Sequence, residues 1–391
     1  MLHTGLEIIA DDLPAGLKDR RIGILCHAPS ITKDFTHITE IFYHRNDCTL
    51  SAIFGPQHGI YGQTQDNMIE WKSHRHPHYN VPLFSLYGEY RKPTADMLKE
   101  IDVLLVDLQD VGARLYTYIW TVKLCIEACF EANIPIWILD RPNPIGRLPF
   151  DGPVLKEEYF TFAGGASIPL CHRMTIGEMA MLLKEKYYPS CNVNIVWMKN
   201  WRRCSLFNET GLPWVLPSPN MPSLQTAIVY PGTVLIEALN ISEGRGTTIP
   251  FELFGAPFIN AYNLKKNLDS RNIPGCAFRI HGFIPTFNKF EGIYCNGLQI
   301  HVTNPGIYHP VETAIDIFDA IIETSESGAL EFNLPPYEYE HKLMPFDILS
   351  GDEVMRKSLT DRIPVSIEKE RWRHEIEDFK REFRQFSVYP E

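Results

Sequence analysis

Short apolar runs alternate with amphipathic stretches through the first half of the chain. The runs with the character of buried strands are residues 21–28, 50–55, 102–108, 134–140 and 193–198. Between them, residues 95–101 and 121–133 repeat their apolar positions at helical spacing. Strands that are apolar throughout and separated by helices are typical of a parallel sheet covered on both faces. The pattern predicts an α/β fold with a Rossmann-like, doubly wound parallel sheet.

A different pattern follows the proline-rich residues 212–223, which are expected to be stiff and extended. Beyond them, the strand-like segments are residues 226–240, 278–287 and 297–304, and the helix-like segments are residues 311–326 and 368–384. We therefore expect two domains: a Rossmann-like domain over residues 1–225, and a smaller α+β domain over residues 226–391 that closes a cleft.

Length and composition agree with this organisation and exclude two classes of partner. The chain has 391 residues, too many for one ordinary core, and it is 45% hydrophobic and 22% charged, as folded globular chains are. Its formal net charge is −11, and no run rich in Lys and Arg offers a face for nucleic acid. No window approaches 18 consecutive apolar residues, so no membrane span is expected.

The first residues and the cysteines favour a cytoplasmic location. Residues 1–16 lack a basic segment followed by a long apolar stretch, so they do not resemble a secretory signal, although a sequence trimmed of its signal would look the same. The nine cysteines show no pairing rhythm, and their odd number argues against a closed disulfide framework.

Polar sequences rich in glycine and proline follow four consecutive predicted strands. They are His27 with Ser30, GPQHG at residues 55–59, DLQDVGARLYTY at residues 107–118 and DRPNP at residues 140–144. Ligands in open α/β sheets bind at the carboxyl ends of the strands, so the four exits predict one polar rim. No G-x-G-x-x-G follows the first strand and no G-x-x-x-x-G-K-[ST] loop occurs, so neither a nucleotide nor another cofactor is expected.

Each exit has a structural and a functional interpretation. The second exit carries Gln57 and His58 and is followed by the acids Asp66 and Glu70. This stretch is either the edge of an active site or only a turn. The third exit carries a possible ion pair between Asp110 and Arg114, and two tyrosines, Tyr116 and Tyr118, that either pack or face a ligand. In the fourth exit, Asp140 and Asn143 either bind turn backbone or line a polar cleft.

Two further motifs offer site residues. In HRMTIGEMA, Thr175 and Glu178 have the spacing of a capping box, which leaves His172 as the better candidate for ligand contact. In SEGRGTT, Glu243 and Arg245 stand between glycines, which suits a loop projecting into an interdomain cleft as well as a solvated loop.

No metal site is expected. The alternating histidines His74, His76 and His78 surround Pro77 and lack flanking strand formers, so an exposed loop is the better interpretation. Cys125 and Cys129 are four residues apart on a predicted helix, where they pack as small apolar residues.

Taken together in order, the motifs resemble those of the exo-β-N-acetylmuramidase family of the NamZ type, long known as a domain of unknown function. The motifs are GPQHGIYG, SLYGEYRKPT, DLQDVGARLYTY, LDRPNP, HRMTIGE, PSPNMP, SEGRGTT and PFELFGAP, and the resemblance runs from about residue 20 to the C-terminus. It implies a Rossmann-like domain joined to a smaller domain, with the active site between them. It also implies removal of N-acetylmuramic acid from the non-reducing end of peptidoglycan fragments, saccharides or muropeptides.

The resemblance carries a set of residues into or near the cleft. They are His58, Asp110, Arg114, Tyr116, Asp140, Arg141, Asn143, Asn220, Glu243 and Arg245. One position departs from the family pattern, because the family has a glutamate, its favoured catalytic acid, where this chain has Gln57. An amide cannot donate a proton to a leaving oxygen as a carboxylic acid does.

Either another carboxyl supplies the proton, or the chemistry has changed or been lost. Glycoside cleavage uses a general acid and a second carboxylate, although 2-acetamido sugars can use their own acetamido oxygen as the nucleophile. We expect Glu70 or Glu243 to be the acid and Asp110 to orient or stabilise.

Substrate recognition is expected to use the other rim residues. Arg114 or Arg245 would pair with the lactyl carboxylate of muramic acid, and Tyr116 or Tyr118 would stack on the sugar. Two alternatives remain: a muropeptide-binding protein without turnover, in which Gln57 marks lost chemistry, and a hydrolase of another amino-sugar conjugate.

Overall fold

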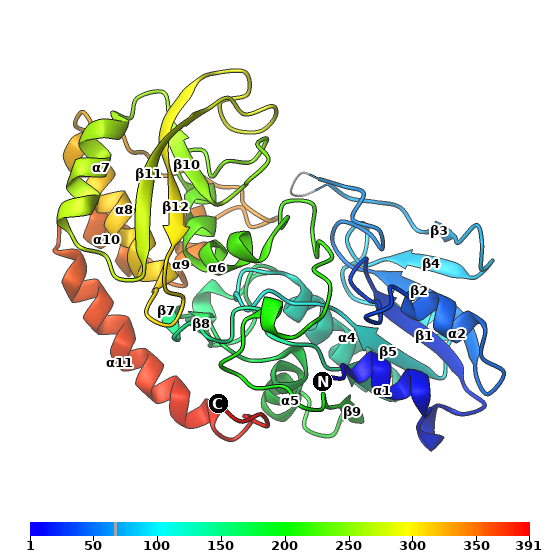
Figure 1. Cartoon of the computed structure of the whole chain (residues 1–391). Coiled ribbons are helices and arrows are strands. Elements are labelled where there is room, and N and C mark those ends of the chain that lie inside the picture. The colour runs from blue at the N-terminus through cyan, green and yellow to red at the C-terminus, as the bar shows by residue number, and fades with distance from the viewer. Residues whose placement is uncertain (66–68) are drawn as a thin grey trace.

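A seven-stranded sheet forms the core of the N-terminal part of the chain (Figure 1). The computed structural model describes residues 1–65 and 69–391, so Asp66 lies outside the described residues. The strands are, in sheet order, β3 (His74–Arg75), β4 (Pro82–Ser85), β2 (Thr49–Gly55), β1 (Arg21–Cys26), β5 (Val103–Asp107), β6 (Ile136–Leu139) and β9 (Val193–Val196). All neighbours pair in parallel except β3 with β4. The predicted α/β fold is confirmed, because five of these strands coincide with the five apolar runs.

Helices cover both faces of this sheet. They are α1 (Gly5–Asp11), α2 (Ile38–Tyr43), α3 (Ala95–Leu98), α4 (Tyr118–Ala132) and α5 (Ile176–Tyr187). Apolar side chains of α1 and α2 share one core with Ile22, Ile24 and Leu105 of the sheet. Those of α4 and α5 share a larger core with Leu104 and Val106, whose side chains alternate to the opposite face. The sheet is therefore doubly covered, and its strand ends are the polar edge left open.

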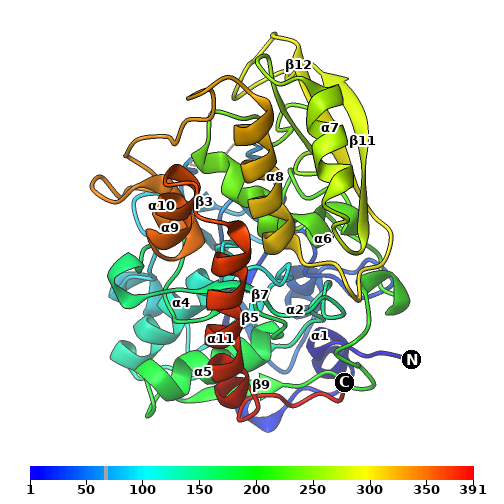
Figure 2. The same ribbon diagram turned by 90° about the vertical axis from the view of Figure 1, so that its left-hand side faces the viewer.

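The C-terminal part is built around a three-stranded antiparallel sheet. Its elements are α6 (Leu224–Thr233), η4 (Val234–Ala238), β10 (Leu253–Ala256), α7 (Ala261–Ser270), β11 (Cys276–Phe283), β12 (Cys295–Val302), α8 (Pro310–Thr324), α9 (Pro345–Ser350) and α10 (Val354–Thr360). The sheet order is β10-β12-β11, and α7 and α8 pack beside it (Figure 2). This is the expected smaller domain with mixed helices and strands.

The strand-like interpretation of residues 226–240 is wrong. These residues form α6 and the 3-10 helix η4, and the side chain of Ser223 caps α6 by accepting a hydrogen bond from the Thr226 amide at 3.1 Å. Residues 226–233 are all buried, so the helix has no polar face and the sequence shows no helical period. A short, wholly apolar run cannot be assigned to helix or strand by periodicity alone.

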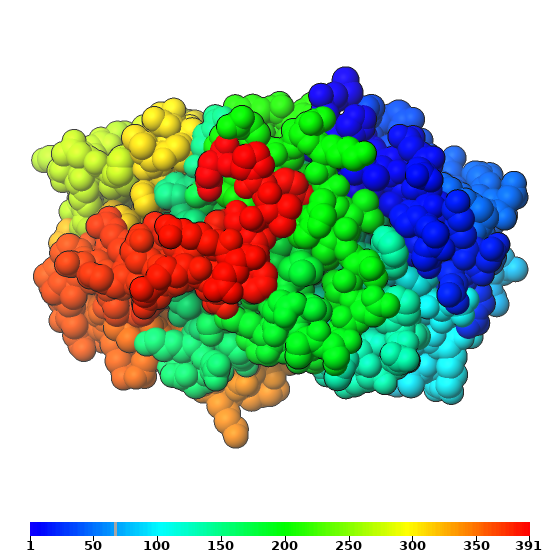
Figure 3. Space-filling view, turned by 90° about the horizontal axis from the view of Figure 1, so that it is seen from below, coloured from blue at the N-terminus to red at the C-terminus, as the bar shows by residue number. Residues whose placement is uncertain are grey.

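The chain ends by returning to the N-terminal part. Helix α11 (Val365–Phe383) packs against β7 (Asp151–Val154), which pairs with β8 (Pro169–Cys171). Figure 3 shows α11 and the last residues, in red, lying across the green surface of the N-terminal part. Tyr389 then packs edge-to-face against Trp201, with the ring centroids 4.9 Å apart and the rings at 89°. The two parts are thus joined by packing far from the linker. No helix in the described part of the chain is long and apolar enough to cross a membrane.

Candidate active site

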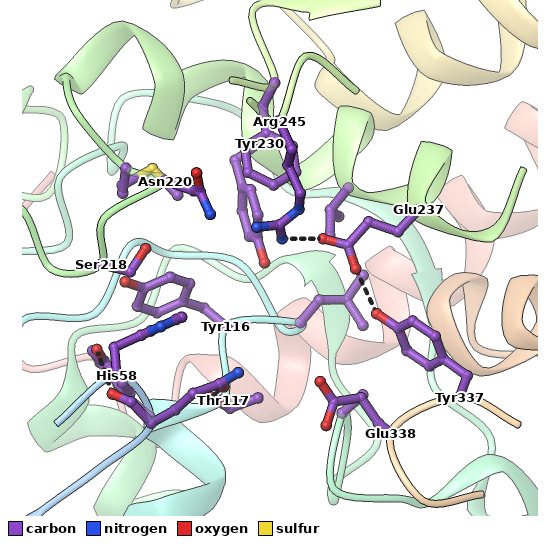
Figure 4. Close-up of a pocket in the computed structure, with 17 residues that line it drawn as sticks. His58, Tyr116, Thr117, Ser218, Asn220, Tyr230, Glu237, Arg245, Tyr337 and Glu338 are labelled. Carbon is purple, nitrogen blue, oxygen red and sulfur yellow. Dashed lines mark hydrogen bonds and ion pairs between the residues drawn. The ribbon is translucent and has the colours of Figure 1, made fainter. Parts of the chain in front are cut away.

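A pocket lies where the two parts of the chain meet (Figure 4). The N-terminal part contributes Gln57, His58, Leu115, Tyr116, Thr117, Tyr118, Ala163, Ser218, Asn220 and Met221. The C-terminal part contributes Tyr230, Val234, Glu237, Arg245, Phe251, Tyr337 and Glu338. The cavity is about 40 Å³, which holds only a few water molecules, and it opens partly to solvent. A ligand of monosaccharide size therefore extends beyond the cavity unless a wall moves.

Glu338 is a carboxyl suited to donate a proton in this pocket. The residue is 7% exposed, and the hydroxyl of Tyr87 donates a hydrogen bond to Glu338 Oε2 at 3.2 Å. Burial raises the pKa of Glu338 to about 7, and the nearby charge of Glu237 acts in the same direction. Arg91 and Arg245 oppose these effects only in part. A carboxyl with this pKa is still partly protonated at neutral pH, as a general acid must be.

Glu237 is a second carboxyl of the pocket and is held in a different environment. Arg245 Nη2 donates to Glu237 Oε1 at 2.6 Å, and the Tyr337 hydroxyl donates to Oε2 at 2.7 Å (Figure 4). Both carboxylate oxygens are therefore fixed by strong donors. One pocket thus contains a protonated acid and an anchored, ion-paired carboxylate, the pairing that acid-base chemistry on a sugar requires.

Arg245 connects the pocket to a buried charge network. Its Nε lies 3.1 Å from Glu243 Oε1, and Lys289 Nζ lies 3.1 Å from Glu243 Oε2. Burial alone would raise the pKa of Glu243, but the charges of Lys289 and Arg245 outweigh it and hold the pKa below its ordinary value. Glu243 is therefore a carboxylate that fixes Arg245, and it is not a proton donor.

The second strand exit places Gln57 and His58 at the pocket. The Thr117 hydroxyl donates to Gln57 Oε1 at 2.7 Å, so the amide NH₂ is the part of Gln57 suited to donate to a ligand. His58 has a left-handed backbone, with φ of +68°, and its Nδ1 lies 2.7 Å from the Thr64 carbonyl oxygen. This strained conformation turns the chain sharply at the end of β2 and presents both side chains to the pocket.

Tyrosine rings form the wall between the two parts. The centroids of Tyr116 and Tyr118 are 4.8 Å apart at 71°, and those of Tyr116 and Tyr230 are 5.9 Å apart at 89°. Burial raises the pKa of all three phenols above its ordinary value, so they are neutral. Asn220 lies beside this wall and donates to the Gln65 carbonyl at 2.7 Å. Flat, neutral aromatic faces suit the apolar face of a sugar ring.

The three carboxyls expected to be catalytic lie outside the pocket lining. Glu70 has a side chain 49% exposed, and its carboxylate accepts a hydrogen bond from the Tyr339 hydroxyl at 3.0 Å. Asp110 is buried beneath the pocket, where it accepts from the Gly112 amide at 2.6 Å and lies 3.6 Å from His172 Nε2. Glu243, as described, is engaged behind Arg245. This geometry favours other carboxyls as the acid.

Arg114 serves the fold rather than the pocket. Its guanidinium donates to four backbone carbonyls, those of Pro153, Ile168, Leu349 and Ser350, at 2.8 to 3.1 Å. Burial lowers its pKa to about 9. The expected ion pair with Asp110 does not appear among its described contacts, and a guanidinium engaged in this way has little left for a substrate carboxylate.

Three residues of the fourth exit also act on the fold. Asp140 accepts hydrogen bonds from the Thr175 hydroxyl and a backbone amide of α5, and burial raises its pKa to about 7. Arg141 forms an ion pair with Asp107 at 2.5 Å, and Asn143 donates to a backbone carbonyl at 3.0 Å. None of the three lines the pocket. The expected capping box of Thr175 at the start of α5 is confirmed.

Sequence reasoning missed several pocket residues: Thr117, Ser218, Tyr230, Glu237, Phe251, Tyr337 and Glu338. Thr117 lies in the motif DLQDVGARLYTY, Ser218 in PSPNMP and Phe251 in PFELFGAP, so these motifs carry a usable signal for the three residues. Tyr230 and Glu237 lie in the segment misread as strands. Glu338 carries no motif, and nothing in its neighbourhood distinguishes it from an exposed acid.

One group of side chains in the described ranges has the arrangement of possible metal ligands, namely Asp151, His309 and Glu312. Asp151 Oδ2 already accepts hydrogen bonds from the first amides of α8, at 2.7 and 3.2 Å, and Arg373 donates to both oxygens of Glu312. The carboxylates thus cap a helix and pair with a guanidinium. This set does not suit a metal. His74 and His78 are exposed, as expected of a loop, but His74 lies in strand β3 and His76 is buried, so the loop interpretation is wrong at these two residues.

Comparison with known proteins places the chain in a family. The family model described as "Exo-beta-N-acetylmuramidase NamZ, N-terminal" matches residues 22–225, and the one described as "Exo-beta-N-acetylmuramidase NamZ, C-terminal" matches residues 228–389. The peptidoglycan beta-N-acetylmuramidase NamZ of Bacillus subtilis (strain 168) is 39% identical over 389 residues, which cover 99% of this chain and 91% of that protein.

Solved structures agree. A DUF1343 family protein from Bacteroides fragilis NCTC 9343 is similar with a TM-score of 0.88 and 29% identity, covering 99% of both chains. A second DUF1343 family protein from the same organism is similar with a TM-score of 0.78 and 28% identity, covering 100% of this chain and 99% of that one.

Proposed function

The chain belongs to the exo-beta-N-acetylmuramidase NamZ family, and we propose that it is a glycosidase that releases N-acetylmuramic acid from the non-reducing end of peptidoglycan fragments. The observation that carries this proposal is the pair of pocket carboxyls, Glu338 and Glu237. Burial keeps Glu338 protonated, while Arg245 and Tyr337 hold Glu237. Two carboxyls in contrasting environments are the requirement for cleaving a glycosidic bond.

In the proposed reaction, Glu338 is the general acid. It donates its proton to the glycosidic oxygen as the bond from that oxygen to C1 breaks. The acetamido oxygen of the substrate bonds to C1, so the protein does not need to supply a nucleophile. Glu237 orients the acetamido N–H, and its own position is fixed by Arg245. Water then attacks C1, the acetamido oxygen leaves, and the proton lost by the water returns to Glu338.

Recognition of the sugar uses the remaining pocket residues. Tyr116 and Tyr230 offer ring faces, and the amide of Gln57 donates to the sugar. Arg245 is the guanidinium of the pocket lining, and its Nε and Nη2 are taken by Glu243 and Glu237. We assign the lactyl carboxylate to its Nη1. The small cavity suits the end of a glycan chain better than its middle.

The test is hydrolysis of two chromogenic sugars, an N-acetylmuramide and the matching N-acetylglucosaminide. The proposal predicts release from the first and much slower release from the second. Faster release from the N-acetylglucosaminide would refute the lactyl assignment and indicate another amino-sugar conjugate as the substrate.

A protein that binds muropeptides without turnover is the rival, and Gln57 favours it, because this amide stands where the resemblance implies a catalytic glutamate. Release from neither sugar, together with muropeptide binding, would support the rival. Restoring the acid with Gln57→Glu separates the two functions further. The rival predicts that the wild-type protein does not hydrolyse the substrate and that this variant does. Our proposal predicts that the wild-type protein already hydrolyses it.

A further inference from the structure

The acid Glu338 sits on a turn with an unusual backbone. The Tyr337 amide donates to the Glu340 carbonyl at 2.9 Å, and the Glu340 amide donates to the Tyr337 carbonyl at 2.8 Å, which closes a two-residue hairpin turn. The two central residues, Glu338 and Tyr339, both have positive φ, of +43° and +69°. Turns of this type strongly prefer asparagine and glycine at these positions, because a β-carbon is crowded there. Contacts outside the turn must hold it.

Those contacts come from the N-terminal part of the chain. The guanidinium carbon of Arg91 lies 3.8 Å from the ring centroid of Tyr339, and it lies 5.3 and 5.4 Å from the ring centroids of Tyr87 and Phe162. Tyr87 also donates the hydrogen bond to Glu338. The Arg91 guanidinium is therefore enclosed by three rings, and one of these rings belongs to the turn that carries the acid.

Stacking holds this guanidinium more than hydrogen bonds do. Within the described residues, the buried Nε and Nη2 atoms of Arg91 have no hydrogen-bond partner. The nearest carboxylate oxygen described, Glu70 Oε1, lies 3.7 Å from Nη2, and that side chain is half-exposed. The attraction of a guanidinium for an aromatic face is similar in size to the strain of a left-handed residue. Loss of the stack would therefore release the turn.

We propose that Arg91 is a positioning residue, which stacks on Tyr339 and so aims Glu338 into the pocket. The proposal rests on the proposed function, in which Glu338 is the acid. Arg91 itself is not part of the pocket lining. It belongs to SLYGEYRKPT, a motif that the pocket lining leaves otherwise unexplained.

The test is a double-mutant cycle of Arg91→Ala and Tyr339→Ala. Alanine removes the ring but keeps the crowded β-carbon, so the strain of the turn stays while the stack is lost. Each variant is expected to lower kcat on the chromogenic N-acetylmuramide about 10- to 100-fold with little change in KM, because a misplaced acid slows the chemistry. The double variant is expected to be no slower than either single one, since both act through one contact.

Two control variants keep stability apart from positioning. Arg173→Ala removes another arginine that stacks on an aromatic ring, 5.2 Å from the centroid of Phe150. Phe35→Ala replaces another aromatic residue with positive φ, one that is exposed and outside the pocket lining. Both are expected to keep kcat. Tyr339→Gly, which removes the ring but also relieves the strain, is expected to lose less kcat than Tyr339→Ala, and Arg91→Lys, which retains the cation, is expected to recover part of the rate lost in Arg91→Ala.

The pH profile gives a readout that a purely structural role would not move. The described groups that face Glu338 are Glu237, Arg245, Tyr87 and Arg91. If the turn leaves the pocket, Glu338 becomes solvated, its pKa falls, and the alkaline limb of kcat/KM moves to lower pH. An upward shift with unchanged kcat would mean that Arg91 acts only as a nearby charge, and would overturn the proposal. A lower Tm with an unchanged profile would overturn it too.

Failure of this inference is distinguishable from failure of the proposed function. If Glu338→Gln abolishes turnover while Arg91→Ala does not reduce kcat, the acid stands and the positioning role is wrong. If Glu338→Gln retains turnover, the assignment of the acid is wrong. A stability measurement needs no turnover: the loss of stability between acid and neutral pH that a buried Glu338 causes is expected to shrink in Arg91→Ala. An unchanged loss would overturn the proposal.

Discussion

Replacement of Glu338 by glutamine is expected to remove activity and to stabilise the protein. The amide keeps the size of the side chain and an oxygen that accepts from Tyr87, but it has no proton to donate. Loss of a general acid lowers kcat by about 10²- to 10⁴-fold. The stability effect follows from the pKa of Glu338, which burial raises from 4.5 to about 7. At 1.36 kcal/mol for each pKa unit, ionisation in the folded protein costs about 3 kcal/mol more than in the unfolded chain.

The sign of the pH dependence follows from proton binding. Below the unfolded pKa, Glu338 is protonated in both states and costs nothing. Between that value and about 7, the folded protein holds a proton that the unfolded chain has lost, so the free energy of unfolding falls as pH rises. Above about 7 the full cost is present. The glutamine variant lacks this cost, so its advantage over the wild type grows with pH.

The assay combines turnover of the chromogenic N-acetylmuramide with urea unfolding of both proteins at about pH 4 and about pH 8. The expected gain in unfolding free energy is about 1–3 kcal/mol at the higher pH and close to zero at the lower one. A variant that keeps more than about a tenth of the wild-type kcat would refute the catalytic role. An equal difference at both pH values would refute the reasoning about burial.

Three further predictions concern the same carboxyls. The wild-type kcat/KM is expected to fall above about pH 7, because burial raises the pKa of Glu338 to about 7 and only the protonated form donates; a pH-rate profile that stays flat to about pH 9 would contradict this. Glu70→Gln is expected to lower kcat less than about tenfold, because the side chain is half-exposed outside the pocket; a loss of about 10²-fold or more would identify Glu70 as the acid. Glu243→Gln is expected to destabilise the protein by about 3–5 kcal/mol in urea unfolding, because it leaves Arg245 and Lys289 without their shared carboxylate; full stability would show that the network contributes little.

The sheet could be predicted because its signal is local. The strands β1, β2 and β5 are mostly apolar runs, and each is followed by a polar exit. Helix α6 could not be predicted, because it is buried on all sides. Its sequence therefore lacks the alternation of apolar and polar residues, with a period of about 3.6, that identifies a helix. The short strands β7, β8 and β10 have only three or four residues, too few to show alternation.

The pocket was predictable only on the side that the strand exits build. The structure places Gln57, His58 and Tyr116 in its lining, as expected of residues at the carboxyl ends of strands. Arg114 and Asp140 also follow predicted strands, yet they form hydrogen bonds with backbone groups of the fold. A sequence does not show which polar side chains bind the protein's own backbone and which face a ligand. Glu338 reaches the pocket from a turn some 280 residues after Gln57, and only packing brings the two together.

The central claim, removal of N-acetylmuramic acid from a non-reducing end, is tested most directly with two natural disaccharides. In one, N-acetylmuramic acid is the non-reducing sugar linked to N-acetylglucosamine; in the other, the order is reversed. We predict that the protein releases both monosaccharides from the first and leaves the second intact, with the first reaction lost in Glu338→Gln. Cleavage of the second disaccharide, or cleavage of neither, would contradict the proposed function.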